Sequence, residues 1–281
     1  MMTANTSHMI VYDSRKKPNL FGYLVKCTRE LSRYRYAYQN FVNNSLSTRY
    51  RRSVLGFFWT LINPLINLTI LAVVFSLVFR QDIRSFGVYV FSALSPWIFM
   101  AGSVNQSPMA FISAESYLKK VYVPKFIFPL TMVTVEGINF FFSMISIYIL
   151  FLLLGTELSW VMLLTPLAML ITFLFILGLA IAIAVVNVYF RDVAHITQVV
   201  MMALMYTIPI MYPMNLIPPE YQWIFTLNPF FHFINLFRII IYEAAVPGLQ
   251  DWLIPLGIAL ITLLVGFYVL MKQDLDLVFR L

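Results

Sequence analysis

The sequence predicts an all-helical protein that crosses a membrane six times, and three observations support this fold class. Of the 281 residues, 61% are hydrophobic and 11% are charged, whereas soluble domains carry about 25% charged residues. The mean hydropathy is +0.83. Six apolar runs, each with at most one charged residue, are long enough to cross a hydrocarbon core of about 30 Å as helices rising about 1.5 Å per residue.

The first expected span is residues 53–79, which contain no charged residue and follow the basic cluster Arg49, Arg51 and Arg52. Basic residues flank the cytoplasmic ends of spans, so this helix should start on the cytoplasmic side. Residues 1–50 show neither the short apolar run nor the cleavage site of a signal peptide. We therefore expect a cytoplasmic N-terminal region at 1–50 and a six-span membrane domain at 51–281.

Within the N-terminal region, residues 20–48 are expected to be helical. Apolar side chains recur there at three- and four-residue spacings, with basic residues between them. This pattern is typical of an amphipathic helix lying on the membrane surface. A helix that contacts a partner protein is the alternative.

Five further spans are expected at 87–110, 126–154, 160–189, 194–212 and 252–271. Between the last two, segments 221–227 and 230–242 are apolar and are separated by Asn228-Pro229. Each is too short to cross a bilayer alone, and such segments are more often re-entrant or interfacial. We therefore expect a re-entrant helical hairpin in the outer leaflet between spans five and six.

The distribution of Lys and Arg sets the orientation. With the N-terminus inside, sixteen of the 19 Lys and Arg residues lie on the cytoplasmic side, and the outer side holds Arg80, Arg84 and Arg238. This asymmetry places both termini in the cytoplasm. The net charge of +7 then mostly reflects orientation, and anionic lipid headgroups are a nearer partner than nucleic acid.

No residue pattern indicates catalysis, a metal or a cofactor. The phosphate-binding pattern G-x-x-x-x-G-K-[ST] is absent. The single cysteine, Cys27, supports neither an internal disulfide nor a Cys-rich metal site. The histidines are far apart and lack metal-ligand spacing; they are His8, His195 and His232.

Glu136 is the only carboxylate inside an expected span. An ionisable group within a membrane is a functional candidate by default. A shallow position facing a partner or a watery cavity fits the sequence equally well. The scarcity of other carboxylates argues against an ion-coupled transporter, which would place acidic or His relays in its spans.

Two inner loops carry charges that could dock a partner protein. Residues 113–128 include Glu115, Lys119 and Lys120, and predict a short amphipathic helix. Residues 187–195 place Arg191 beside Asp192 at the end of a span. A plain solvated loop and a helix cap formed by the aspartate are the alternatives.

Four stretches resemble, in the same order, the ABC-transporter permeases that export lipid-linked polysaccharides such as O-antigen and teichoic acid. They are RYRRSVLGFFWTLINP at 49–64, LKKVYVPKFIFPL at 118–130, NVYFRDVAHI at 187–196 and LNPFFHFINLFR at 227–238. The chain is thus identified as a member of this family of type-2 ABC exporter transmembrane subunits, which are transport subunits and not enzymes.

The resemblance implies a homodimeric permease of the bacterial cytoplasmic membrane, bound to two copies of a separate ATPase. Its cargo would be a polysaccharide on undecaprenyl diphosphate. The N-terminal helix and the 113–128 loop would contact the ATPase, together with Arg191 and Asp192, and the hairpin would gate the outer side. Capsular polysaccharide is an alternative cargo.

Two groups of residues would meet this cargo. Arg49, Arg51 and Arg52 stand where a lipid diphosphate would arrive, and guanidinium groups bind phosphate bidentately; orientation of the span alone is the alternative. The aromatic residues Trp59, Trp97 and Tyr206 would stack on passing sugars in the channel. Anchoring of the spans at the membrane interfaces is the alternative for these rings.

Two other protein classes are weighed against an ABC permease. A membrane-embedded glycolipid transferase would need a carboxylate cluster at a membrane face, and only Asp274 and Asp276 form a close pair. An ion-coupled flippase would need more charge in its spans.

Overall fold

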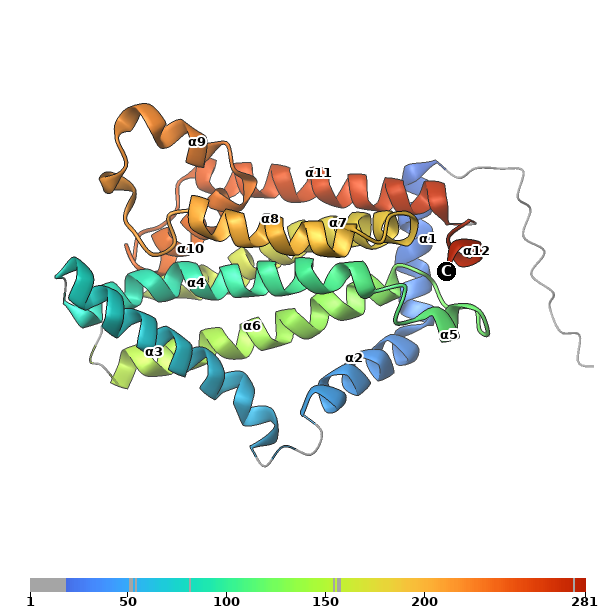
Figure 1. Cartoon of the computed structure of the whole chain (residues 1–281), viewed down its shortest axis with the longest axis horizontal. Coiled ribbons are helices and arrows are strands. Elements are labelled where there is room, and N and C mark those ends of the chain that lie inside the picture. The colour runs from blue at the N-terminus through green and yellow to red at the C-terminus, as the bar shows by residue number, and fades with distance from the viewer. Residues whose placement is uncertain are drawn as a thin grey trace, which may run out of the picture.

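The computed structural model describes residues 19–50, 53, 55–80, 82–153, 155, 158–274 and 276–281. Within these residues the chain forms helices and no strand, which confirms the all-helical part of the prediction. Figure 1 shows α4, α6, α7, α8 and α11 running lengthwise, with α1 crossing one end and α9 at the other. The C-terminus lies at the α1 end.

The N-terminal segment forms two helices rather than one. Helix α1 spans Leu20–Arg33 and α2 spans Arg35–Tyr50, with a turn at Tyr34 between them. One face of α1 packs on the protein, since Tyr23 and Cys27 are buried. Burial raises the pKa of the Cys27 thiol to about 12. Contact with the membrane surface by the opposite face stays a prediction.

The remaining helices lie close to the predicted ranges. The long ones are α3 (Trp59–Phe79), α4 (Ile83–Gln106), α6 (Ile127–Leu153), α7 (Thr165–Tyr189), α8 (Val193–Thr207) and α11 (Leu249–Gln273). The short ones are α5 (Glu115–Leu118), α9 (Gln222–Thr226), α10 (Pro229–Ile241) and α12 (Leu277–Arg280). Short 3-10 turns are η1 (Gly56–Phe58), η2 (Ser107–Met109), η3 (Trp160–Leu164), η4 (Met214–Leu216) and η5 (Pro219–Tyr221).

Of the described helices, four are long and apolar enough to cross a membrane: α4, α6, α7 with η3, and α11. A broken pair, Pro219–Thr226 and Pro229–Ile241, also qualifies when taken together, and its halves are bent by 101°. The break falls at the predicted Asn228-Pro229. Helix α8 is shorter, with 15 residues.

Two predicted boundaries were wrong. The expected helix at 194–212 ends at Thr207, where Ile208 becomes extended because the following Pro209 disfavours helix at the residue before it. The expected helix at 87–110 begins earlier, at Ile83. Its start is fixed by Asp82, whose Oδ2 accepts hydrogen bonds from the backbone N–H groups of Arg84 and Ser85, both at 3.1 Å.

The closest helix packing joins α7 to α11. Gly178 faces Gly266 across this contact, and a Cβ on either residue would collide with the partner helix's backbone. Small residues let membrane helices approach this closely. Helix α10 packs against α7 through aromatic side chains: the Phe233 ring stacks on the Phe175 ring, with ring centroids 4.3 Å apart.

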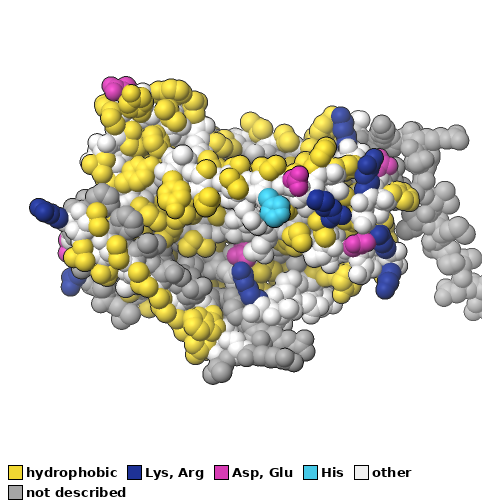
Figure 2. Space-filling model, in the orientation of Figure 1, with side chains coloured by type: hydrophobic (Ala, Val, Ile, Leu, Met, Phe, Trp, Pro, Cys, Tyr) yellow, Lys and Arg dark blue, Asp and Glu magenta, His cyan; other side chains and the backbone are white. Residues whose placement is uncertain are grey.

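The basic side chains of the described residues are unevenly distributed over the surface. In Figure 2, Lys and Arg gather at the end that carries α1, α5 and α12, while hydrophobic side chains cover much of the length between the two ends. Basic residues at one end and an apolar middle suit a helical bundle that spans a membrane with this end in the cytoplasm.

Candidate functional site

An ion pair lies inside the bundle between α2 and α6. The Arg49 Nη1 donates to Glu136 Oε1 at 2.8 Å, and the Glu136 side chain is 8% exposed against 43% for Arg49. Glu136 is nine residues beyond Ile127, about 13 Å along α6 at about 1.5 Å per residue. The Glu136 carboxylate is therefore buried within the protein, and Arg49 compensates its charge; its depth in the membrane stays a prediction.

Two amides complete the surroundings of the Glu136 carboxylate. The Nε2 of Gln106, the last residue of α4, donates to Oε1 at 2.5 Å, and the Asn139 Nδ2 donates to Oε2 at 3.4 Å. A buried charge is tolerated only when it is paired and hydrogen-bonded. Gln106 could not be anticipated, since nothing in the sequence links it to α6.

A cavity of about 340 Å³ lies between α2, the segment after α4, and α6. It is lined by Phe41, Asn44, Ser45, Thr48, Ala110, Ser113, Ala114, Tyr117, Phe128, Thr131 and Met132. Two walls reach the ion pair at helical spacing: Ser45 lies one turn before Arg49 on α2, and Met132 lies one turn before Glu136 on α6. We call this cavity together with the ion pair the polar crevice.

Of the predicted basic cluster, only Arg49 can be placed, because Arg51 and Arg52 lie outside the described residues. The Arg49 guanidinium uses Nη1 toward Glu136 and is partly exposed. A guanidinium carries five N–H donors, so Arg49 can be anchored by the carboxylate and still offer donors to an anion.

The two charged inner loops lie near one another. Lys119 Nζ contacts Glu115 Oε1 at 2.6 Å. The hydrogen bond and charge of Lys119, and more weakly the charge of Arg191, hold the pKa of Glu115 below its usual value. Lys120, Arg191 and Asp192 are exposed. Docking of a partner by these residues stays a prediction.

The three aromatic residues proposed for the channel differ in their exposure. Trp59 and Tyr206 are exposed by 41% and 72%. Trp97 is only 3% exposed and meets Phe230 of α10 edge-on, with ring centroids 6.0 Å apart. A sugar could contact Trp97 only after α10 moves.

Arg238 is a structural residue whose environment could not be predicted. It is 6% exposed, its Nη2 donates to the Pro209 carbonyl at 2.7 Å, and its guanidinium lies over the Tyr89 ring, 4.1 Å from the centroid. The Tyr89 hydroxyl donates to the Tyr212 carbonyl at 2.8 Å. Together, α4 and α10 hold the extended segment that follows α8.

Asn187, near the C-terminal end of α7, also connects separate segments by hydrogen bonds. Its Nδ2 donates to the Pro108 carbonyl at 2.7 Å, and its Oδ1 accepts from the Ala194 N–H at 3.1 Å. The side chain is 1% exposed. A lone amide within an apolar run was the signal in the sequence that could have identified it.

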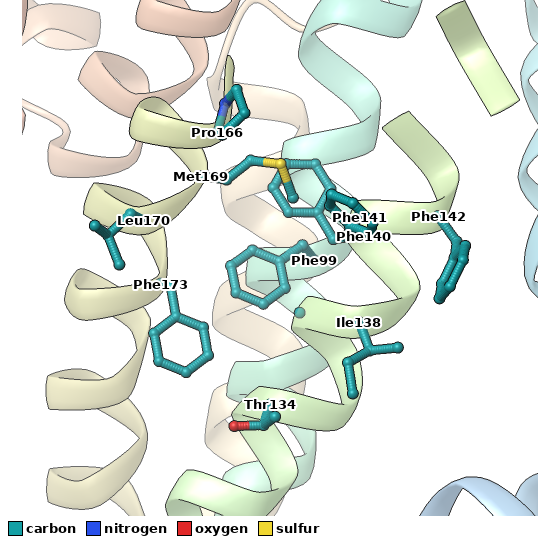
Figure 3. A pocket seen from close by; sticks show the side chains of 11 residues that line it. Phe99, Thr134, Ile138, Phe140, Phe141, Phe142, Pro166, Met169, Leu170 and Phe173 are labelled. Atoms are coloured by element: carbon teal, nitrogen blue, oxygen red, sulfur yellow. The ribbon is translucent and has the colours of Figure 1, made fainter. Parts of the chain in front are cut away.

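An apolar groove of about 450 Å³ lies between α4, α6 and α7. Figure 3 shows the aromatic side chains of Phe99, Phe140 and Phe173 along it, with Thr134 at one end. Thr134 shares a hydrogen bond with the Tyr38 hydroxyl of α2, 2.7 Å between the oxygens. Apart from this end, the groove offers hydrocarbon contact only. Among the described residues, no group of three or more His, Cys, Asp or Glu side chains could hold a metal.

Comparison with known proteins identifies the family. Residues 36–242 match the profile of the family described as ABC-2 type transporter. The chain belongs to the ABC-2 type transporter family. This ABC-2 chain is 31% identical over 229 residues to the O-antigen export system permease protein RfbA of Myxococcus xanthus, covering 81% of this chain and 88% of that protein. It is 33% identical over 189 residues to RfbA of Klebsiella pneumoniae, covering 66% and 73%.

The family confirms that this ABC-2 chain is a membrane transport component and not an enzyme. The polar crevice and Arg238 fall inside the matched range 36–242. Helices α1 and α11 fall outside it and contact each other. The polar crevice and Arg238 therefore lie in the part of the chain that matches the family profile.

Proposed function

We propose that this chain is the permease subunit of an ABC transporter that exports undecaprenyl-diphosphate-linked polysaccharide of the O-antigen or teichoic-acid type. A separate ATPase subunit, in two copies, would drive a homodimer of this chain in the bacterial cytoplasmic membrane. The observation that carries the proposal is the similarity to an O-antigen export permease over 81% of the chain.

The proposed topology has six spans with both termini inside. Helix α3, with 21 residues, and α8 would join the four long apolar helices. The bent pair α9–α10 would be the re-entrant outer hairpin. Arg238 supports this part of the proposal, because it links α10 to the carbonyl groups that follow α8.

The lipid diphosphate would bind at Arg49, Arg51 and Arg52. Phosphate oxygens accept paired hydrogen bonds from a guanidinium, whereas lysine acts as a point charge. Glu136 would hold Arg49 at a fixed position for this contact. The ATPase would dock on Glu115, Lys119, Lys120, Arg191 and Asp192, which lie exposed or half-buried at the cytoplasmic end.

The sugar chain would then pass Trp59 and Tyr206, whose exposed rings suit contact across a dimer. Trp97 would join them when α10 shifts. Ring stacking is tolerant of sequence, which suits a polymer that must slide; with nucleic-acid bases it contributes about 1–3 kcal/mol per base.

The function is tested in inside-out vesicles that contain the permease and its ATPase. We expect ATP-dependent movement of lipid-linked glycan into the lumen, measured as glycan protected from an added glycosidase. Replacement of Arg49, Arg51 and Arg52 by lysine should keep the orientation and reduce transport. The matched control replaces Arg29, Arg33 and Arg35 by lysine. No ATP-dependent movement by the unmodified protein would refute the proposed function.

A further inference from the structure

We propose that the cavity of the polar crevice is a binding site for a neutral sugar, namely the sugar attached directly to the lipid diphosphate. The inference rests on the proposed function and adds a recognition step to it. The cavity would hold this sugar while Arg49 binds the diphosphate.

The lining has the chemistry of a sugar site. Six side chains carry a hydroxyl or an amide: Asn44, Ser45, Thr48, Ser113, Tyr117 and Thr131. Three are aromatic, counting Tyr117 again, and Phe41 contacts the other two: its ring lies 5.3 Å from that of Tyr117 and 5.4 Å from that of Phe128. None of the lining residues is charged.

This combination favours a sugar over other small ligands. An anion or a cation would call for charged partners, which the cavity walls do not supply. An apolar group would use the aromatic side chains only and would make no hydrogen bond with the hydroxyl and amide groups. A sugar ring presents hydroxyl groups at its rim and C–H bonds on its faces, so it satisfies both kinds of wall.

The hydroxyl groups keep acceptor capacity for a ligand. Ser113 Oγ donates to the Met109 carbonyl at 2.8 Å, and Thr131 Oγ1 donates to the Ile127 carbonyl at 2.8 Å. A hydroxyl oxygen that donates its proton still has lone pairs, so both can accept from sugar hydroxyl groups. The volume of about 340 Å³ is at the small end of ligand pockets, which span about 300–1,000 Å³, and suits one sugar rather than a long chain.

The position of the cavity matches the covalent order of the ligand. Ser45 and Arg49 are one helical turn apart on α2, and Thr48 precedes Arg49 directly. On α6, Met132 of the cavity lies one turn before Glu136, the anchor of Arg49. A diphosphate bound at Arg49 would therefore place the attached sugar next to the cavity.

The test uses the full permease with its ATPase in lipid nanodiscs and two probes. One probe is undecaprenyl diphosphate that carries a single hexose, and the other is undecaprenyl diphosphate without sugar. The readout is the probe concentration that half-saturates the change in ATP hydrolysis. The variant is Asn44→Ala with Ser45→Ala, and its control is Asn43→Ala with Ser47→Ala, two exposed residues of α2 that do not line the cavity.

We expect the Asn44/Ser45 variant to raise the half-saturating concentration of the sugar-bearing probe about tenfold, for the loss of two hydrogen-bonding side chains. The sugar-free probe should be unaffected, and the control should change neither. Thr48→Val, which keeps the volume of the side chain and removes its hydroxyl, should act in the same direction. Thermal stability of each purified variant verifies that the fold is intact.

Three results would overturn the inference. If the half-saturating concentration shifts equally for both probes, or for neither, the cavity does not bind the sugar. A loss of ATPase binding that lowers ATP hydrolysis at every probe concentration, with unchanged half-saturating concentrations, would assign the cavity to the protein partner. An unmodified transporter that responds to neither probe would instead refute the proposed function, and the inference would fall with it.

Discussion

At the scale of single residues, the Glu136 carboxylate shows how a charge is kept inside a helical membrane protein. Its donors come from α2, from α4 and from its own helix: Arg49, Gln106 and Asn139. Breaking a buried pair by removing one partner costs more than the pair itself contributes. Arg49 and Glu136 should therefore depend on each other for stability.

We expect Glu136→Gln to destabilise the protein by about 1–3 kcal/mol, because the amide group would place a donor against the donors of Arg49 and Gln106. The exchange of charges, Arg49→Glu with Glu136→Arg, should recover part of this loss while impairing export, since phosphate loses its guanidinium at position 49. Thermal unfolding of the purified protein and vesicle transport measure the two effects.

The matched control is Glu115→Gln. Its pair with Lys119 is exposed, with 42% of the Glu115 side chain accessible, and exposed ion pairs contribute about 0–1 kcal/mol. A Glu136→Gln protein as stable as this control would show that the buried pair has no role in holding α2 against α6.

At the scale of helices, two contacts fix how neighbouring elements sit. Gly178 and Gly266 set the distance between α7 and α11. Arg238 holds the non-helical segment 208–212 against α10. The first contact is steric and the second is polar, so they respond to different substitutions.

Gly266→Ala should lower the stability by about 1–3 kcal/mol, because the added methyl group overlaps the backbone of Gly178 and overpacking forces the helices apart. Gly257→Ala in the same helix is the control, since nothing lies within 4 Å of the added Cβ. The melting temperatures of both variants give the comparison. Equal melting temperatures would contradict close packing at Gly266.

Arg238→Lys should loosen the segment after α8 while keeping a positive charge at this position. Lysine cannot reproduce the planar contact with Tyr89 and the bond to Pro209 together, and a hydrogen bond from a charged group contributes about 1.5–3 kcal/mol. We expect amide hydrogen exchange at 210–212 to become about tenfold faster. Arg84→Lys, at an exposed position on the outer side, should leave exchange unchanged.

At the scale of the whole molecule, the two ends differ in charge and in construction. The end with α1, α5 and α12 carries many of the basic side chains (Figure 2). It is tied together by Lys125 of the α6 start and Asp274 at the end of α11, 2.9 Å apart. A basic end held together in this way suits the proposed contact with a soluble ATPase.

Charge reversal at Lys119 and Lys120 should cut ATP-driven export strongly and leave the amount of inserted permease unchanged. Both positions are exposed. The acidic side chains introduced there would repel the ATPase surface that the lysines are proposed to contact. Co-purification of the ATPase measures docking, and transport in vesicles measures the consequence.

Arg84→Glu at the outer end makes a similar charge change away from the proposed docking surface and serves as the control. Topology must be verified for both proteins, since basic residues also set orientation. Undiminished export from the correctly oriented Lys119/Lys120 variant would exclude this loop as the docking element.

The sequence by itself determined the helical class and the break at Asn228-Pro229, and it predicts the six spans and their orientation. These follow from local properties: the length of apolar runs, the placement of Lys and Arg, and the effect of proline on the backbone. The family could also be predicted, because its motifs are short and contiguous. The charged residues of the inner loops could be nominated for the same reason.

Only the tertiary structure decided which side chains meet. Arg49 and Glu136 are 87 positions apart in the chain, and no local pattern pairs them or adds Gln106. Trp97 was predicted for the channel and is buried against α10. The physical reason is that lipid is as apolar as the protein interior, so the hydrophobicity of a membrane helix does not reveal which of its faces packs on protein.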